Sequence, residues 1–250
     1  MVAPLRELDP GLSSTAVPLA GGHLVLLGPG IYVNRGVAMG LGVETTRQDL
    51  EAIEELCETT GVPPEIEVCP WAHHSLLEAT AERGYRAAWF RNTLICELVA
   101  NSPTTSSGPI AIEKADDPAA LALWQDTAAV GFGYTTTEQR RISDLYTAAV
   151  RQIDGTVLYL ASIDGHVVGA ASLTVRDRMA TLGGMTTLPS ARGQGVQTAM
   201  IGFRLTAAVT AGCDLAVTTA APGSGSERNL LHSGFAVTYT KVGLRKPSRR

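Results

Sequence analysis

The sequence predicts an α/β (α+β) fold that is divided into two domains. Two observations support this prediction. Apolar residues at helical spacing alternate with short apolar runs of strand length, and glycine or proline ends most of these segments. A small, polar, proline-containing segment over residues 101–109 separates two parts of comparable size. A chain of 250 residues with 45% hydrophobic and 18% charged residues is typical of a globular protein with one large domain or two small ones.

Changes in composition and pattern predict four segments along the chain. Residues 1–20 are expected to be a loose lead-in that can include a short helical turn, and residues 21–100 to form the first domain. Residues 101–109 are the predicted linker, since serine, threonine, glycine and proline dominate them. Residues 110–250 are expected to fold as the second domain.

The clearest element of the first domain is a helix over residues 47–60. Leu50, Ile53 and Leu56 recur at helical spacing, Thr45-Thr46 offers an N-cap, and Gly61 ends the helix. The remaining elements are expected to be short strands at 23–27, 31–35 and 65–69, a second helix at about 75–83 and one or two strands within 85–98.

The second domain is expected to begin with a strand, two helices and three successive strands. The two-residue sequence Asp164-Gly165 predicts a tight hairpin turn between the first two of those three strands. The expected elements are a strand at 110–114, helices at 118–130 and about 138–150, strands at 156–163, 167–175 and 179–187, a long helix ending at Gly212, a strand at 215–219, a short helix at 227–233 and a strand region at 235–244.

The segment Arg192-Gly193-Gln194-Gly195 opens the long helix, after a strand that ends at Thr187 and a turn at Leu188-Pro189. Glycines at a helix start let the backbone approach a ligand closely, and the first N–H groups of a helix have no partner within it. These groups and the positive end of the helix dipole favour an anion. We therefore expect a phosphate-bearing ligand on residues 192–198.

Two nucleotide-binding motifs match this segment poorly. A P-loop requires a lysine after its last glycine, and none follows Gly195. The dinucleotide fingerprint requires glycine or alanine where Thr198 stands, and Asp214 precedes the next strand instead of following it. The dinucleotide interpretation stays open as the weaker alternative.

The segment resembles the pyrophosphate loop of the GNAT superfamily of N-acetyltransferases. That loop follows the pattern Arg/Gln-x-x-Gly-x-Gly/Ala, and residues 192–197 match every position except the last, where Gln197 replaces a small residue. The expected order of elements over residues 110–250 is also that of one complete GNAT acetyltransferase domain. The resemblance implies a mixed, mostly antiparallel sheet flanked by helices, with acetyl-coenzyme A (acetyl-CoA) as the acyl-donor cosubstrate.

The first half repeats the end of the second half in a degenerate form. In each half a long helix ends at a glycine, a strand follows, and a short helix ends at Gly84 or Gly234. We interpret the chain as a tandem pair of GNAT-like domains, and chance recurrence of this order in an α/β protein is the alternative. The matching loop of the first half, residues 36–47, lacks the pyrophosphate pattern and contains Glu44, so we expect no coenzyme A (CoA) there.

The resemblance also implies which residues bind acetyl-CoA. The backbone at the end of the third strand would pair with the pantetheine arm, and the loop and helix start would hold the pyrophosphate. One residue just before the last short helix and one within it would line the channel. These residues are Met185, Thr186, Thr187, Arg192, Gly193, Gln194, Gly195, Val196, Gln197, Thr198, Ser226 and Asn229.

The catalytic residues stay unknown at this stage. The usual acid of the family is a tyrosine four residues before the glycine that ends the short helix, and that position is Leu230 here. His232 and Tyr239 are nearby substitutes in the sequence, and Tyr134 or a chain of waters could deprotonate the amine. Gly183-Gly184 stand where some relatives have an acidic residue.

These observations predict an N-acetyltransferase that transfers the acetyl group to the amine of a small molecule or to an amino terminus, by direct attack on the thioester. A non-catalytic acyl-CoA binding or sensing module is the alternative, because the usual acid is missing and Gln197 departs from the pattern. A third interpretation is a tandem acyltransferase resembling mycothiol synthase, with only its second half active.

Composition limits the partners. A net charge of −4 argues against general nucleic-acid binding, and no apolar run is long enough for a membrane span or a secretory signal. The four cysteines have no Cys-x-x-Cys spacing, and no pattern of ligands predicts a metal site. We therefore expect a cytoplasmic protein with a small-molecule or peptide amine acceptor and with no nucleic-acid, membrane or metal partner; homodimerisation is left open.

Overall fold

The computed structural model describes residues 2–98 and 109–247, and these residues form two compact units. Unit 1 combines Met1–Asn92 with Tyr239–Arg250, and unit 2 is Thr93–Thr238. Residues 101–108 of the predicted linker lie outside the described residues. Compared with the predicted boundaries, residues 93–98 group with the second half of the chain and residues 239–247 group with the first.

Unit 1 contains sheet strands in the order β1–β2–β3–β4–β11–β5. Antiparallel pairing joins β1 to β2, β2 to β3 and β4 to β11, whereas β3 and β4 are parallel. The elements are α1 (Val2–Leu8), β1 (Thr15–Leu19), β2 (Gly22–Leu26), β3 (Arg35–Val37), α2 (Arg47–Thr60), β4 (Glu65–Val68), α3 (His74–Glu82), the first part of β5 (Arg86–Glu97) and the last part of β11 (Ala236–Arg245).

Helix α2 confirms the prediction for residues 47–60. The side chain of its N-cap, Thr46, accepts a hydrogen bond from the Asp49 backbone N–H, and the Asp49 side chain accepts one from the Thr46 backbone N–H. This reciprocal capping box satisfies donors that the helix itself leaves without partners. Leu50, Ile53 and Cys57 are buried against the sheet, and Gly61 ends the helix with a left-handed φ of 65°.

Two regions of unit 1 differ from the expectation. Residues 1–20 contain α1 and the strand β1, so this segment is part of the folded unit. The strand expected at 31–35 is wrong for residues 31–34, which form a turn. The Asn34 side chain organises that turn, since it accepts from Leu27 N–H and donates to the carbonyls of Gly28 and Ile31. An asparagine that bonds the local backbone in this way competes with strand pairing.

Unit 2 has the predicted order of elements and the sheet order β11–β5–β10–β9–β8–β7–β6. Strands β6 to β9 are antiparallel, and β9 and β10 are parallel. The elements that complete the chain are β6 (Ile110–Lys114), α4 (Pro118–Gly131), α5 (Thr137–Arg151), β7 (Thr156–Ile163), β8 (His166–Arg176), β9 (Met179–Thr187), a 3-10 turn (Pro189–Ala191), α6 (Val196–Thr210), β10 (Leu215–Ala220) and α7 (Gly225–His232).

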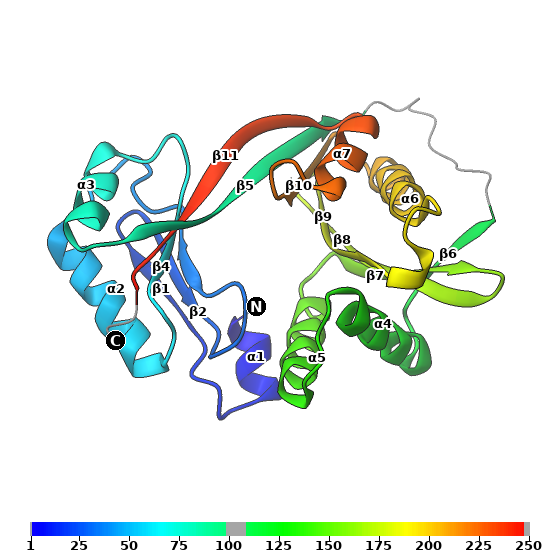
Figure 1. Cartoon of the computed structure of the whole chain (residues 1–250), viewed down its shortest axis with the longest axis horizontal. Coiled ribbons are helices and arrows are strands. Elements are labelled where there is room, and N and C mark those ends of the chain that lie inside the picture. Colours follow the sequence, from blue (N-terminus) through cyan, green and yellow to red (C-terminus); the bar gives the residue numbers. More distant parts are fainter. Residues whose placement is uncertain (1, 99–108, 248–250) are drawn as a thin grey trace. The chain divides into compact units, whose positions relative to one another are not determined.

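Helices cover both faces of the sheet in unit 2. Figure 1 shows α4 and α5 on one face of β7–β9, with α6 and α7 on the other. Leu158 and Leu160 of β7 pack with Trp124 of α4, whereas Tyr159 and Ala161 belong to the cluster that includes α6. Because successive side chains of a strand point to opposite faces, β7 contributes to two hydrophobic cores. The predicted α/β (α+β) class with a mixed sheet is confirmed.

The last strand of each half joins the sheet of the unit formed by the other half. Residues 242–245 of β11 pair antiparallel with residues 65–68 of β4 in unit 1. In unit 2 the later residues of β5 lie next to β10, and the N–H of Leu98 donates to the carbonyl of Asp214. This exchange accounts for the difference between the compact units and the predicted domain boundaries.

The close approach of β11 to β5 in unit 1 generates a prediction. A Cβ added at Gly243 would lie 2.1 Å from Cε2 of Trp89, whose indole N–H is held by Glu65 at 2.9 Å. We expect Gly243→Ala to lower the free energy of unfolding by about 1–3 kcal/mol, because the added methyl group would overlap the indole ring and force it away from Glu65. Urea denaturation monitored by fluorescence measures this change.

The matched control for this prediction is Gly225→Ala. The nearest atom to a Cβ at Gly225 is Nη2 of Arg228 at 3.7 Å, an ordinary contact with the end of a flexible side chain. We expect a change within about 0.5 kcal/mol for this variant. Equal effects of the two substitutions would contradict the steric account.

Candidate functional site

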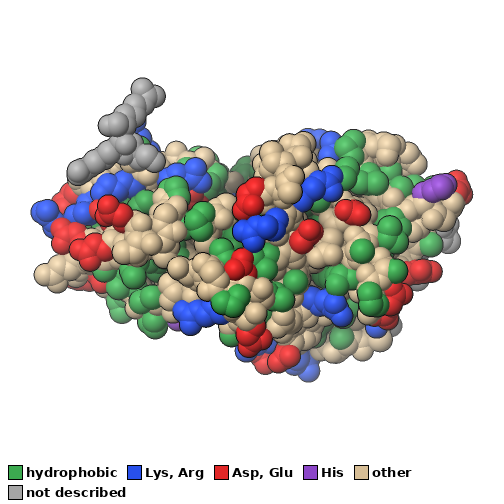
Figure 2. Space-filling model, turned by 90° about the horizontal axis from the view of Figure 1, so that it is seen from below, with side chains coloured by type: hydrophobic (Ala, Val, Ile, Leu, Met, Phe, Trp, Pro, Cys, Tyr) green, Lys and Arg blue, Asp and Glu red, His purple; other side chains and the backbone are tan. Residues whose placement is uncertain are grey.

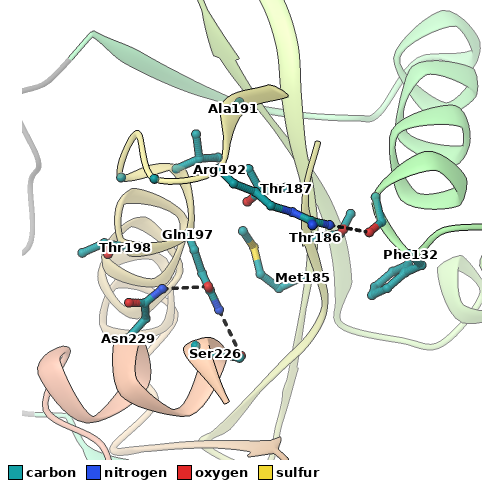
Figure 3. Close-up of a pocket in the computed structure, with 15 residues that line it drawn as sticks. Phe132, Met185, Thr186, Thr187, Ala191, Arg192, Gln197, Thr198, Ser226 and Asn229 are labelled. Atoms are coloured by element: carbon teal, nitrogen blue, oxygen red, sulfur yellow. Dashed lines mark hydrogen bonds between the residues drawn. The ribbon is translucent and has the colours of Figure 1, made fainter. Parts of the chain in front are cut away.

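A pocket of about 610 Å³ lies in unit 2 where β9 ends and α6 and α7 begin. Figure 3 shows the side chains that line it, with the end of α4 on the opposite side. The lining residues are Gly131, Phe132, Met185, Thr186, Thr187, Ala191, Arg192, Gly193, Gly195, Val196, Gln197, Thr198, Gly225, Ser226 and Asn229.

The start of α6 is built to leave backbone donors facing this pocket. Gly193 and Gly195 have left-handed φ values of 80° and 81°, and a Cβ at either position would meet nothing within 4 Å. Glycine is therefore favoured there by backbone conformation and not by lack of space. The N-cap Gly195 supplies no side-chain acceptor, and the first turn contains no acidic residue. The first N–H groups of α6 are thus available to an anion.

Arg192 is the ionisable side chain among the residues that line the pocket. Its guanidinium extends past Thr187 toward the end of α4, where Nη2 lies 3.5 Å from the carbonyl oxygen of Gly131 (Figure 3). A contact of this length is weak, and the side chain is exposed. The pocket therefore has a positive group that can turn toward a ligand at small cost, and its lining has no carboxylate.

A polar bridge between α6 and α7 forms another wall of the pocket. Nε2 of Gln197 donates to Oγ of Ser226 at 3.0 Å, and Nδ2 of Asn229 donates to Oε1 of Gln197 at 2.8 Å (Figure 3). Gln197 is the residue that departs from the GNAT loop pattern. Its amide uses both a donor and an acceptor to tie the two helix starts together.

The end of α4 packs very closely against β9. A Cβ added at Gly131 would lie 2.1 Å from Oγ1 of Thr186, and Thr186 is itself buried. Only a residue without a side chain fits at this contact. The close packing places Gly131 and Phe132 in the wall that faces Met185 and Arg192.

Strand β9 carries a β-bulge just before the residues that enter the pocket. Ala170 of β8 pairs with Thr186, and Ser172 pairs with Gly183, so Ala171 lies opposite both Gly184 and Met185. Gly184 has a left-handed φ of 54°. Such a bulge bends the strand and leaves the extra residue without a normal ladder partner. The backbone at residues 184–185 is therefore displaced from regular pairing.

All of the residues predicted to bind acetyl-CoA line this one pocket except Gln194. Gln194 instead donates from Nε2 to the carbonyl of Ser190 at 3.2 Å. Sequence reasoning missed four lining residues. Two of them are distant from the loop in the sequence, and the other two each precede a predicted residue but lie outside the motif. These residues are Gly131, Phe132, Ala191 and Gly225.

The candidate acids and bases lie outside the pocket lining. Leu230 is buried in the hydrophobic core, and His232 is exposed with its Nδ1 2.7 Å from the carbonyl oxygen of Arg228. Tyr239 belongs to unit 1, where its ring packs edge-on against Trp71 at 4.7 Å between centroids. Tyr134 follows Phe132 in the loop after α4 but does not line the pocket either.

Comparison with protein-family models gave a match in the second half of the chain. Residues 119–235 match the model of the Acetyltransferase (GNAT) family. The matched range runs from α4 to the end of α7 and contains every residue that lines the pocket. The search of curated proteins gave no match.

Several solved structures, some of them described as GNAT proteins, share this fold. A GCN5-related N-acetyltransferase from Kribbella flavida has a TM-score of 0.68 at 19% identity, over 99% of this chain and 95% of that one. A conserved protein of unknown function from Staphylococcus epidermidis has a TM-score of 0.70 at 13% identity, over 95% and 96%. A tandem GNAT protein from the clavulanic acid biosynthesis pathway has a TM-score of 0.62 at 14% identity, over 90% and 74%. At these identities the likeness shows the fold alone.

The contact between Gly131 and Thr186 generates a prediction for the pocket wall. We expect Gly131→Ala to lower the free energy of unfolding by about 1–3 kcal/mol, because its methyl group would overlap the Thr186 side chain. Thr186→Ala removes the hydroxyl and the methyl group that it would overlap. In the double variant the cost of the Gly131 substitution should fall by more than about 0.5 kcal/mol.

Urea denaturation of the parent, the two single variants and the double variant measures this coupling. Additive effects of the two substitutions would show that the end of α4 doesn't depend on its contact with Thr186.

Proposed function

We propose that the chain is an acetyl-CoA-dependent N-acetyltransferase that acts on the amine of a small molecule or on an amino terminus. The observation that carries the proposal is the uncapped glycine start of α6, which opens into the pocket beside Arg192. The family match over residues 119–235 supports the same function.

The residues of the pocket fit CoA in charge and in position. The free N–H groups at the start of α6 and the Arg192 guanidinium would hold the pyrophosphate, since both favour an anion. The backbone of Met185–Thr187 would lie along the pantetheine arm, with Ser226 and Asn229 on the other side. When bound, acetyl-CoA supplies a thioester whose acetyl carbon can accept an amine.

In the proposed transfer, the amine nitrogen forms a bond to the acetyl carbon while the carbon–sulfur bond breaks. Backbone N–H groups near the β9 bulge at Gly184–Met185 would stabilise negative charge on the carbonyl oxygen. The amine proton would pass to water or to a group near the amine outside this pocket, because the pocket lining contains no carboxylate, histidine or tyrosine. The thiolate would take its proton from water for the same reason.

That lack of an acid or base favours a second candidate, a non-catalytic acyl-CoA binding or sensing module. Leu230 occupies the position of the family's usual tyrosine and is buried. Thiol release measured with a panel of amines separates the two functions. Tight binding of acetyl-CoA with no release of the CoA thiol in the presence of any amine would favour the sensing module.

We also propose that unit 1 is a degenerate GNAT-like partner that does not bind CoA. The elements α2–β4–α3–β5 repeat the order of α6–β10–α7–β11, and one similar structure is described as a tandem GNAT protein. The start of α2 is unlike that of α6, because the side chains of Thr46 and Asp49 accept hydrogen bonds from two backbone N–H groups there and Asp49 adds a negative charge. The domains at 21–100 and 110–250 remain a proposal within this interpretation.

The expected partners also remain proposals. In the described part of the chain, none of the helices has the length and apolar composition needed to cross a bilayer. The face drawn in Figure 2 has acidic and basic side chains interspersed. These features agree with a cytoplasmic enzyme that has a small-molecule or peptide acceptor and no nucleic-acid partner; a homodimer stays open.

Isothermal titration with acetyl-CoA tests the binding step. We expect the parent to bind, and Arg192→Glu to raise the Kd by about 10- to 100-fold, because it removes a charge-assisted contact and places a negative charge beside the phosphates. Arg178→Glu is the matched control, since Arg178 is exposed and doesn't line the pocket. No binding by the parent, or equal binding by the two variants, would overturn the proposed site.

A further inference from the structure

The β9 bulge is supported from both faces of the sheet by buried side-chain donors. From α4, the indole N–H of Trp124 donates to the carbonyl of Ala171, the residue opposite the bulge, at 3.0 Å. From α6, Nη1 of Arg204 donates to the carbonyls of Ser172 and Gly183 at 3.0 and 3.3 Å. Side chains thus bond the carbonyls that flank the irregular pairing.

Burying the charged Arg204 side chain at this position costs folding free energy. Arg204 is only 2% exposed, and the described residues give its guanidinium no carboxylate partner. Its hydrogen bonds go to backbone carbonyls, including that of Met200 at 3.1 Å. Burial lowers the pKa of Arg204 to about 10, so the side chain is charged at neutral pH. A buried charge without a counter-ion destabilises a fold, whereas an apolar side chain of similar size would not.

Trp124 makes a steric contact with the same bulge. It is 5% exposed, and a Cβ at Gly184 would lie 3.6 Å from its ring atom Cζ2. The ring therefore packs against the backbone of the extra residue while its N–H bonds to the opposite strand. Arg204 and Trp124 together fix both strands at residues 171–172 and 183–184.

We propose that Arg204 and Trp124 are positioning residues that hold the β9 bulge in the geometry required for acetyl transfer. This inference rests on the proposed function. The carbonyl of Gly183 and the N–H of Gly184 belong to one peptide unit, so a cation at the carbonyl polarises that unit and makes its N–H a stronger donor. The buried charge of Arg204 thereby acts on the strand segment that would face the thioester oxygen, although Arg204 itself doesn't line the pocket.

The experiment compares Arg204→Met, Arg204→Lys and Trp124→Phe with the parent and with Arg178→Met, an arginine substitution at an exposed position. Hydrogen–deuterium exchange over residues 182–187 reports on the bulge without any need for activity. Isothermal titration gives the Kd for acetyl-CoA, and thiol release gives kcat with the best amine.

We expect Arg204→Met and Trp124→Phe to exchange faster over residues 182–187 and to lose kcat by about tenfold or more, while the Kd changes by less than about threefold. Lysine keeps the charge but has one nitrogen in place of the two that Arg204 uses, so Arg204→Lys should regain part of kcat. Arg178→Met should match the parent in all three measurements. If Arg204→Met does not fold, Trp124→Phe, which keeps a buried ring, decides the question.

The outcomes separate this inference from the proposed function. A parent that binds acetyl-CoA but transfers nothing would overturn the enzyme function, and exchange over 182–187 would still test the support of the bulge. An active parent with kcat unchanged in both Arg204→Met and Trp124→Phe would overturn the positioning role. A kcat loss equalled by a loss of acetyl-CoA affinity would also overturn it, because such a result indicates general damage to the pocket.

Discussion

The unpaired backbone N–H groups at the start of α6 are the constraint on which the site depends. An α-helix leaves its first donors without partners, and most helices satisfy them with a side chain, as Thr46 and Asp49 do for α2. At α6 the left-handed glycines at 193 and 195 provide no such side chain. The surrounding wall supplies one positive group, Arg192, and no negative one. The charge and the free donors of the site therefore suit an anion.

The sheet beneath this helix is irregular where β9 reaches the pocket. The bulge at Gly184–Met185 interrupts regular pairing immediately before the strand enters the pocket. Trp124 and Arg204 donate hydrogen bonds to the carbonyls that flank it. A requirement that the bulge keep one geometry would explain why the fold tolerates the free-energy cost of burying the Arg204 charge. In this account, Arg204 lowers the stability of the fold through its buried charge but supports the geometry of the site through its hydrogen bonds.

Local signals in the sequence predicted much of the fold and most of the pocket. The capping residues and Gly61 set the limits of α2, and Asp164-Gly165 formed the predicted hairpin between β7 and β8. The loop residues lie together because they are close in the sequence. The exchange of β5 and β11, the contact of Gly131 with Thr186 and the burial of Arg204 could not be predicted, since each depends on pairing between distant segments.

The measurement that tests the central claim most directly is a CoA titration followed by backbone amide NMR of the full chain. The account predicts that the largest shift changes occur at the amides of Gly193 and of residues 195–198, with smaller changes along residues 185–187. The amides at the start of α2 should stay unchanged. Binding with unchanged amides at the start of α6, or with the largest changes in unit 1, would contradict the account.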